Sequence, residues 1–210
     1  EAEELEPILA AEIPTKENGG ISADTQTVTW KLKEGILWSD GEPFTAEDVA
    51  ITYQFITNTE VGSTSVEFYG DVETVTAIDD LTVEITFKQP TPAPMSPFVG
   101  GSGMILPAHV FQDYLGANAR SAPGNTAPVG TNAYQVSEFK PGDTIVYEPN
   151  PNFRGDAPAF STVELKGGGD AVSAARAILQ TGEADYAWNV QAEPAVLKGL
   201  EAAGKGEMSY

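Results

Sequence analysis

The stretch at residues 30–56, WKLKEGILWSDGEPFTAEDVAITYQFI, decides how this chain folds. Apolar and polar residues alternate from position 28 to position 33, which is the period-2 pattern of a half-buried strand. The run WSDG at 38–41 then predicts a tight turn, because Ser and Asp bond to nearby backbone and Gly accepts the dihedral angles of the turn.

A capped helix follows the turn. Thr45 is the expected N-cap, and Asp48 three positions later completes a shortened capping box. The expected buried face of this helix repeats at i, i+4 and i+7, with Val49, Tyr53 and Ile56. None of these side chains is arranged for chemistry, so we expect the whole stretch to be architectural.

Three groups of motifs resemble one protein family. KLKEGI at 31–36 with WSDGEPFTAEDV at 38–49 resembles the signature of the peptide/nickel class (family 5) of ABC-transporter solute-binding proteins. PVGTNAY at 128–134, running on to NPNFRG at 150–155, resembles the PVGTGPY…NPxYxG segment of that family. ILQTGEAD at 178–185 resembles its L-x-x-GE-x-D segment, and the three groups occur in the order of the family.

Two adjacent positions depart from the family pattern. Asn132 and Ala133 stand where the family has Gly-Pro. Asn tolerates a left-handed φ better than most residues, so we expect the turn to survive. The departure puts in doubt any ligand contact made by the backbone of this loop.

The resemblance implies a fold class and a division of the chain. The fold would be part of a type II periplasmic binding protein, α+β in its first part and α/β in its second. Residues 1–126 would form most of a small extra α+β subdomain with hairpins. Residues 127–210 would form the middle of lobe I, with part of its mixed sheet, and the boundary would fall in the loose stretch 116–127. We expect the second lobe to be absent and the opening EAEELEPILAAEIP to be preceded by further strands and a signal in a longer protein.

The remaining periodicities predict further elements. These are hairpins over 72–87 and 134–148, a proline-rich connector at 89–97, strands at 160–166, 184–190 and 207–210, and helices at 106–115, 170–180 and 193–203. Pro107 is expected at the first position of its helix, and Asp170 is expected to cap the helix that it precedes.

Composition excludes several classes of function. The chain has 31 acidic and 11 basic side chains, a formal charge of −20, which argues against nucleic acid and against anionic lipid as partners. It contains no cysteine, so disulfides, thiolate metal sites and a cysteine nucleophile are excluded. The lone His109 cannot build a triad or a His-based metal site by itself. We therefore expect no enzyme activity, no cofactor and no metal.

Two other classes of function stay open as alternatives. A secreted carbohydrate-active hydrolase would need two carboxylates that converge on one pocket. The candidate pairs all have ordinary structural explanations and are Glu47 with Asp48, Asp79 with Asp80, and Glu183 with Asp185. A structural surface domain would show no ligand cleft at all.

Aromatic residues provide the candidate ligand site. Trp188 and Asn189 lie at the end of the predicted strand 184–190, and ligands of open α/β sheets collect at strand ends. The resemblance implies that this strand runs toward the cleft between the two lobes, so both residues would face ligand. The alternative is a Trp188 buried in the sheet. Tyr69 and Tyr210 are further candidates, whereas Trp30, Tyr53, Phe55 and Phe87 are expected in the core.

The resemblance also implies a function. Complete proteins of this kind capture oligopeptides, or nickel complexes, opines or sugars, outside the cytoplasmic membrane by closure of two lobes. The expected partners are the peptide or other small solute, an ABC-transporter permease and the second lobe of the same polypeptide. We expect the complete protein to be extracytoplasmic and lipid-anchored, in the periplasm or on the cell surface.

Overall fold

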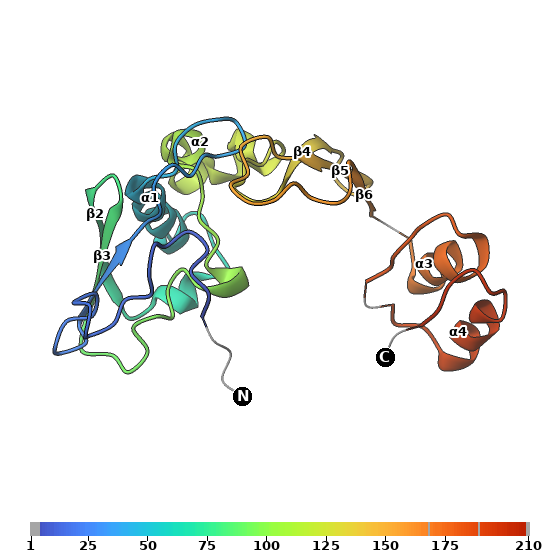
Figure 1. Ribbon diagram of the computed structural model, residues 1–210, viewed down its shortest axis with the longest axis horizontal. Helices are drawn as coiled ribbons and strands as arrows, with labels where there is room; N and C mark the ends of the chain where they lie inside the picture. The colour runs from blue at the N-terminus through green and yellow to red at the C-terminus, as the bar shows by residue number, and fades with distance from the viewer. Residues whose placement is uncertain (1–4, 168, 189, 209–210) are drawn as a thin grey trace. The chain divides into compact units, whose positions relative to one another are not determined.

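The structure is a computed structural model, and it describes residues 5–167, 169–188 and 190–208 (Figure 1). The chain forms two compact units. The first unit comprises Glu1–Lys140 and Ile145–Glu164, and the second comprises Pro141–Thr144 and Leu165–Tyr210. These units are compact parts of this chain. The boundary predicted near residue 126 separates a subdomain from a lobe of a larger protein, so it stays a prediction.

A three-stranded antiparallel sheet forms the base of the first unit. Its order is β1 (Thr27–Lys31), β3 (Thr82–Phe87), β2 (Val72–Asp79). The alternation in β3 places Val83, Ile85 and Phe87 on the buried face, each with at most 1% of its surface exposed. The predicted strand and the predicted hairpin over 72–87 are therefore confirmed.

Helix α1 (Ala46–Thr57) packs on this sheet and completes the core. Its capping box is present, and the Thr45 N–H donates to Asp48 Oδ2 at 2.7 Å. Val49 and Ile56 are buried as predicted, and the half-buried Tyr53 donates its hydroxyl proton to the Val72 carbonyl at 3.2 Å. The helix thus covers the sheet with the face that its sequence period predicted.

The segment after the sheet is less regular than its sequence indicated. Residues 89–97 form the predicted connector without helix or strand. Helix α2 (Ala108–Phe111) is much shorter than the predicted helix 106–115, and Pro107 is its N-cap instead of its first residue. A short helix depends on packing rather than on its own propensity. Only the two ends of α2, Ala108 and Phe111, are buried, so little packing supports a longer helix here. The chain continues in 3₁₀ turns, namely η3 (Gln112–Tyr114), η4 (Gly116–Ser121) and η5 (Pro123–Asn125).

A second sheet has the order β4 (Tyr134–Phe139), β5 (Thr144–Pro149), β6 (Val163–Lys166). The first two strands form the predicted antiparallel hairpin, with an irregularity in register between Val136 and Glu138. Gly142 takes a φ of +76° in the connecting turn, a conformation that other residues rarely adopt. The last strand is shorter than the predicted 160–166.

The second unit is built mainly of helices. Asp170 caps α3 (Ala171–Arg176) as predicted, and its Oδ1 accepts from the N–H groups of Val172 and Ser173 at 2.9 Å each. The helix continues as a π turn, η6 (Ala177–Thr181), and α4 (Pro194–Glu201) lies within the predicted helix 193–203.

The predicted strand at 184–190 is wrong. Its described residues, 184–188 and 190, have no regular structure. A strand requires a hydrogen-bonded neighbour, and no described strand pairs with this segment. Residues 207 and 208 of the predicted strand 207–210 are also irregular, and the rest of it lies outside the described residues.

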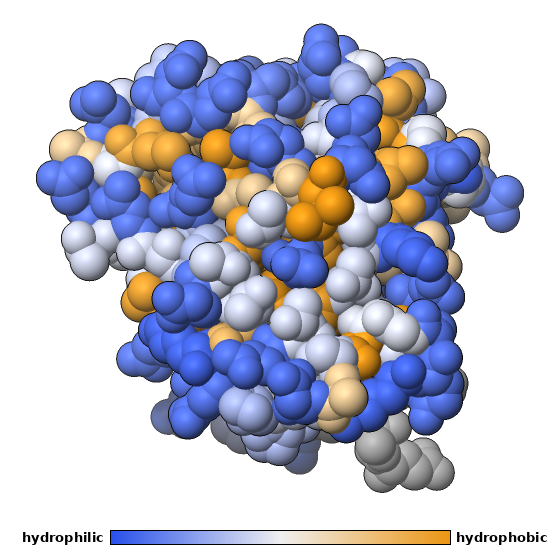
Figure 2. All heavy atoms as spheres, turned by 90° about the vertical axis from the view of Figure 1, so that its left-hand side faces the viewer, coloured by the Kyte–Doolittle hydropathy of each residue, from blue (hydrophilic) through white to orange (hydrophobic). Residues whose placement is uncertain are grey.

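One face of the molecule combines hydrophilic and hydrophobic residues (Figure 2). Figure 2 shows the side that carries β2 and β3, where hydrophobic residues gather between hydrophilic ones. Within the described part of the chain, no helix combines the length and the apolar character needed to cross a bilayer.

Candidate functional site

Two of the three motif groups meet at the turn of residues 38–41 in the first unit, whereas the third, at 178–185, belongs to the second unit. Ser39 donates its N–H to the Gly130 carbonyl at 2.9 Å, and Gly130 donates its N–H to Ser39 Oγ at 3.3 Å. Asn152 Nδ2 donates to the carbonyls of Trp38 and Ser39 at 3.1 and 3.2 Å. Segments more than ninety positions apart are thereby joined through backbone groups. We call residues 38–41, 130–133 and 150–154 the signature junction.

Two more side chains of the signature junction have structural partners. The buried Asn150 donates from Nδ2 to the Asn132 carbonyl at 2.9 Å, which holds the loop that departs from the family pattern. Asn132 keeps a negative φ, so the left-handed conformation that Asn could tolerate is not used. Arg154 donates to the carbonyls of Thr131 and Ile8 at 3.1 and 3.2 Å. These contacts of the signature junction are structural, and the sequence predicted this role only for the stretch 30–56.

Asp48 is a second structural hub, with 2% of its surface exposed. Besides the Thr45 N–H, its carboxylate accepts from Trp38 Nε1 at 3.3 Å and from the Ala108 N–H at 2.6 Å. The Trp38 ring also packs edge-on against Phe44, with 5.6 Å between centroids. Asp48 therefore joins the turn, α1 and the start of α2. The capping pattern predicted the local bond but gave no signal for the partner 60 residues away.

Asn152 gives a first test of the signature junction. We expect Asn152→Ala to lower the free energy of unfolding by about 1–3 kcal/mol, because two backbone carbonyls lose their donor. Asn152→Asp should cost more than the alanine, since a carboxylate then faces the same two carbonyls. Asn118→Asp is the control: it adds the same charge at an exposed position. Urea denaturation measures all three, and an Asn152→Asp variant as stable as Asn118→Asp would contradict the role.

The candidate catalytic and metal-binding side chains lie in environments that a structural role explains. Backbone and side-chain hydrogen bonds, the first from Leu81 N–H, lower the pKa of Asp79 in the hairpin turn. Glu47 is exposed while its neighbour Asp48 is buried, so the two do not share a pocket. His109 Nε2 lies 2.8 Å from Asp40 Oδ2, a hydrogen-bonding distance, at a partly exposed position. Within the described ranges, no three His, Asp or Glu side chains are grouped to hold a metal ion.

Trp188, the leading candidate for ligand contact, lies in the irregular segment between η6 and α4 of the second unit. Its side chain is 80% exposed, so the alternative of a tryptophan buried in a sheet is not what the structure shows. Tyr186, two positions earlier, is 72% exposed and is a further candidate that the sequence analysis does not include, although its spacing from Trp188 is a usable signal. Asn189 lies outside the described residues. Its role and that of Trp188 stay predictions.

The segment that carries Trp188 begins at a well-defined helix end. Gly182 ends η6 in the left-handed conformation, with φ +69°, where a side chain would be strained. Leu179 and Ala175 of the preceding helical turns are buried and form the core of the second unit. Hydrogen bonds from the backbone and hydroxyl of Ser173 lower the pKa of Asp170, so the helix cap is charged at neutral pH.

Tyr69, the third candidate, is a core residue of the first unit. It ends η1 (Val66–Tyr69), is 2% exposed, and packs against the rings of Tyr53 and Phe98 at 6.1 and 5.1 Å. Burial raises the pKa of its phenol, and the backbone of Phe98 partly opposes this shift. Among the described residues its hydroxyl has no partner with hydrogen-bond geometry. Tyr210, the fourth candidate, lies outside the described residues.

Solved structures show which class of fold this is. The ABC-transporter substrate-binding protein CtaP of Listeria monocytogenes has a TM-score of 0.72 at 28% identity, over 93% of this chain and 38% of that protein. The oligopeptide-binding protein AppA of Bacillus subtilis, solved with a nonapeptide, has a TM-score of 0.70 at 26% identity, over 84% and 34%. The chain thus has the fold of part of a type II periplasmic binding protein, which confirms the predicted fold class.

The sequence comparison identifies the family. The family "Bacterial extracellular solute-binding proteins, family 5 Middle" matches residues 4–205, so the chain belongs to family 5 of these proteins. Protein XP55 of Streptomyces lividans is 33% identical over 163 residues, which are 77% of this chain and 28% of that protein. The chain therefore spans about a third of the length of its relatives. The recognition from the three motif groups is confirmed.

Proposed function

We propose that this chain is one part of a two-lobed extracytoplasmic protein that captures oligopeptides and delivers them to an ABC-transporter permease. The observation that carries the proposal is the family match over residues 4–205. The nonapeptide held by the structurally similar AppA supports a peptide as the ligand class. The complete protein would be lipid-anchored and would close by hinge motion of its lobes, without covalent chemistry.

The exposed aromatic residues suit this ligand class. Trp188 and Tyr186 offer apolar planes with one polar group each, and a peptide offers both apolar side chains and backbone donors and acceptors. In the proposed protein Trp188, Asn189 and Tyr210 contact the peptide. Tyr69 is buried in the core of the first unit, so the proposal gives it no contact with the peptide.

The second lobe is required for tight binding in this proposal. Pockets of this kind bury about 70–90% of the ligand surface, and one lobe alone supplies one wall. We therefore expect the 210-residue chain alone to bind peptides no tighter than about millimolar, or about −4 kcal/mol. Micromolar binding by the isolated chain, measured by calorimetry, would contradict the two-lobed mechanism.

The complete two-lobed protein provides the direct test. Native mass spectrometry of the purified protein should identify a bound peptide, and calorimetry with that peptide gives the reference affinity. Trp188→Ala should weaken it about tenfold to a hundredfold, as expected for a central aromatic contact. Phe160→Ala removes another exposed aromatic ring, 68% exposed, and is the matched control. Equal affinities of both variants would exclude Trp188 from the ligand site.

A further inference from the structure

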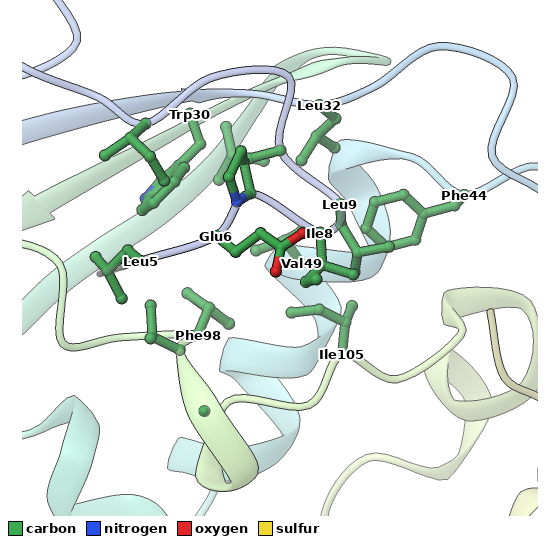
Figure 3. A pocket seen from close by; sticks show the side chains of 16 residues that line it. Leu5, Glu6, Ile8, Leu9, Trp30, Leu32, Phe44, Val49, Phe98 and Ile105 are labelled. Atoms are coloured by element: carbon green, nitrogen blue, oxygen red, sulfur yellow. The ribbon is translucent and has the colours of Figure 1, made fainter. Parts of the chain in front are cut away.

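The first unit contains an apolar cavity of about 190 Å³ that the signature junction does not use. Its floor comes from the first sheet and α1, and two further segments line its partly open sides: residues 5–13, and residues 98–105 with the 3₁₀ helix η2 (Gly100–Ser102). Figure 3 shows the lining side chains directed at a shared space. The main contributors are Trp30, Leu32, Phe44, Val49, Phe98 and Ile105.

Residues 5–13, here called the N-terminal strap, are fixed in place by hydrogen bonds. Lys33 Nζ donates to the Pro7 carbonyl at 2.7 Å, and the Lys33 N–H donates to the Leu9 carbonyl at 2.9 Å. The Ala11 N–H donates to the Lys31 carbonyl at 2.7 Å. The strap is therefore an ordered wall of the cavity rather than a loose segment resting on the sheet.

The opposite wall, residues 98–105, is conformationally strained. Phe98 has a φ of +61°, a left-handed conformation that costs a non-glycine residue about 1–3 kcal/mol. A Cβ at Gly103 would lie 2.2 Å from the Phe98 and Val99 backbone, so the loop closes tightly on itself. Such strain is typical of segments that clamp a ligand, because the surroundings must hold it in place.

The cavity also carries one charge. Glu6 on the strap is the only ionisable side chain among its described lining residues, and Figure 3 shows it extending among them. The neighbouring cations, Lys33 and Arg154, bind backbone carbonyls of the strap. Glu6 is exposed, so its carboxylate lies at the solvent-facing side of the pocket, where it favours a ligand that pairs a hydrocarbon group with a positive charge.

We propose that this cavity is a binding site for a small organic cation, an aromatic or branched hydrocarbon group that bears an amine. The size fits, because an apolar cavity of about 150 Å³ in another protein holds benzene. The hydrocarbon group fills the space between Trp30, Val49 and Ile105, and the ammonium group pairs with Glu6. This site belongs to the first unit, whereas the Trp188 segment of the proposed peptide site belongs to the second.

The test uses phenethylamine on the complete 210-residue chain, with amide chemical shifts as the readout. Saturable shifts are expected at the lining residues Trp30, Leu32 and Ile105, with a dissociation constant of about 1 mM. Phenylpropionate carries a negative charge in place of the ammonium group and should bind about tenfold more weakly. The affinity of the uncharged ethylbenzene should lie between those of phenethylamine and phenylpropionate. No saturable shifts at about ten times that concentration would overturn the proposal.

Two variants separate the hydrocarbon contact from the charge contact. Val49→Phe fills the cavity from α1 and should abolish the shifts. Glu6→Gln lies at the exposed strap, leaves the core unchanged and should weaken phenethylamine binding about twofold to fivefold without affecting ethylbenzene. Equal binding of phenethylamine and phenylpropionate by the unsubstituted chain would overturn the assignment of Glu6. Shifts centred on Trp188 instead of Trp30 would overturn the site itself.

Discussion

Replacement of Asp48 by alanine is expected to lower the free energy of unfolding of the first unit by about 3–5 kcal/mol. The carboxylate accepts hydrogen bonds from the Thr45 and Ala108 N–H groups and from Trp38 Nε1, and it is 2% exposed. Removing it leaves three donors without their acceptor in the core. The loss should release the start of α2 as well as the first turn of α1.

Glu47→Ala is the matched control for Asp48. Glu47 lies in the same first helical turn but is exposed, so its replacement should change stability by no more than about 0.5 kcal/mol. Urea denaturation followed by tryptophan fluorescence measures the stability of both variants. Both carry Trp188→Phe as well, so that the fluorescence comes only from Trp30 and Trp38 in the first unit. A loss for Asp48→Ala that matched Glu47→Ala would show that the hub does not support the fold. Faster hydrogen exchange at Ala108 should accompany the loss.

Phe87→Ala is expected to destabilise the first unit by about 3–5 kcal/mol through the loss of apolar burial and the cavity that remains. Phe87 is the last residue of the central strand β3, and its side chain is 1% exposed. Its own N–H donates to the Gln26 carbonyl at 2.8 Å and its carbonyl accepts from Gln26 Nε2 at 3.0 Å, so the backbone cannot easily move to fill the space.

The identical substitution at an exposed position gives the comparison for Phe87. Phe68 is 54% exposed in η1, and Phe68→Ala should change the urea midpoint far less. If the free energy of unfolding of Phe87→Ala lay within about 1 kcal/mol of the value for the unsubstituted chain, the sheet would have repacked around the missing ring. Amide exchange along β1 and β2 would then show whether the pairing of β3 survived.

The scaffold of the first unit could be predicted because its signals are local. Alternation in 82–87 assigns every second side chain to the buried face, and the spacing of Thr45 and Asp48 specifies the helix start. The same kind of local signal placed Asp170 at the start of α3. The motif groups, read in order, were sufficient to identify the family.

The candidate site was less predictable, for a reason specific to each residue. Tyr69 lies in a loop-like sequence without a period, so nothing local indicated that its ring would pack between Tyr53 and Phe98. Trp188 was assigned to a strand because alternation alone does not reveal whether a neighbouring strand exists. The exposure of Tyr186 beside it has no sequence signal of its own, since aromatic residues are ordinarily expected in a core.

Local sequence patterns were enough to predict the family, the caps of α1 and α3, both hairpins and the buried faces of α1 and β3. Tertiary structure alone decided that Asp48 receives the Ala108 N–H, that Asn152 binds the turn 114 positions before it, and that a cavity lies under the N-terminal strap. Periodicity is encoded in neighbouring residues, whereas a long-range hydrogen bond exists only after the chain has brought distant backbone groups together. Local patterns therefore specify surfaces, and packing selects their partners.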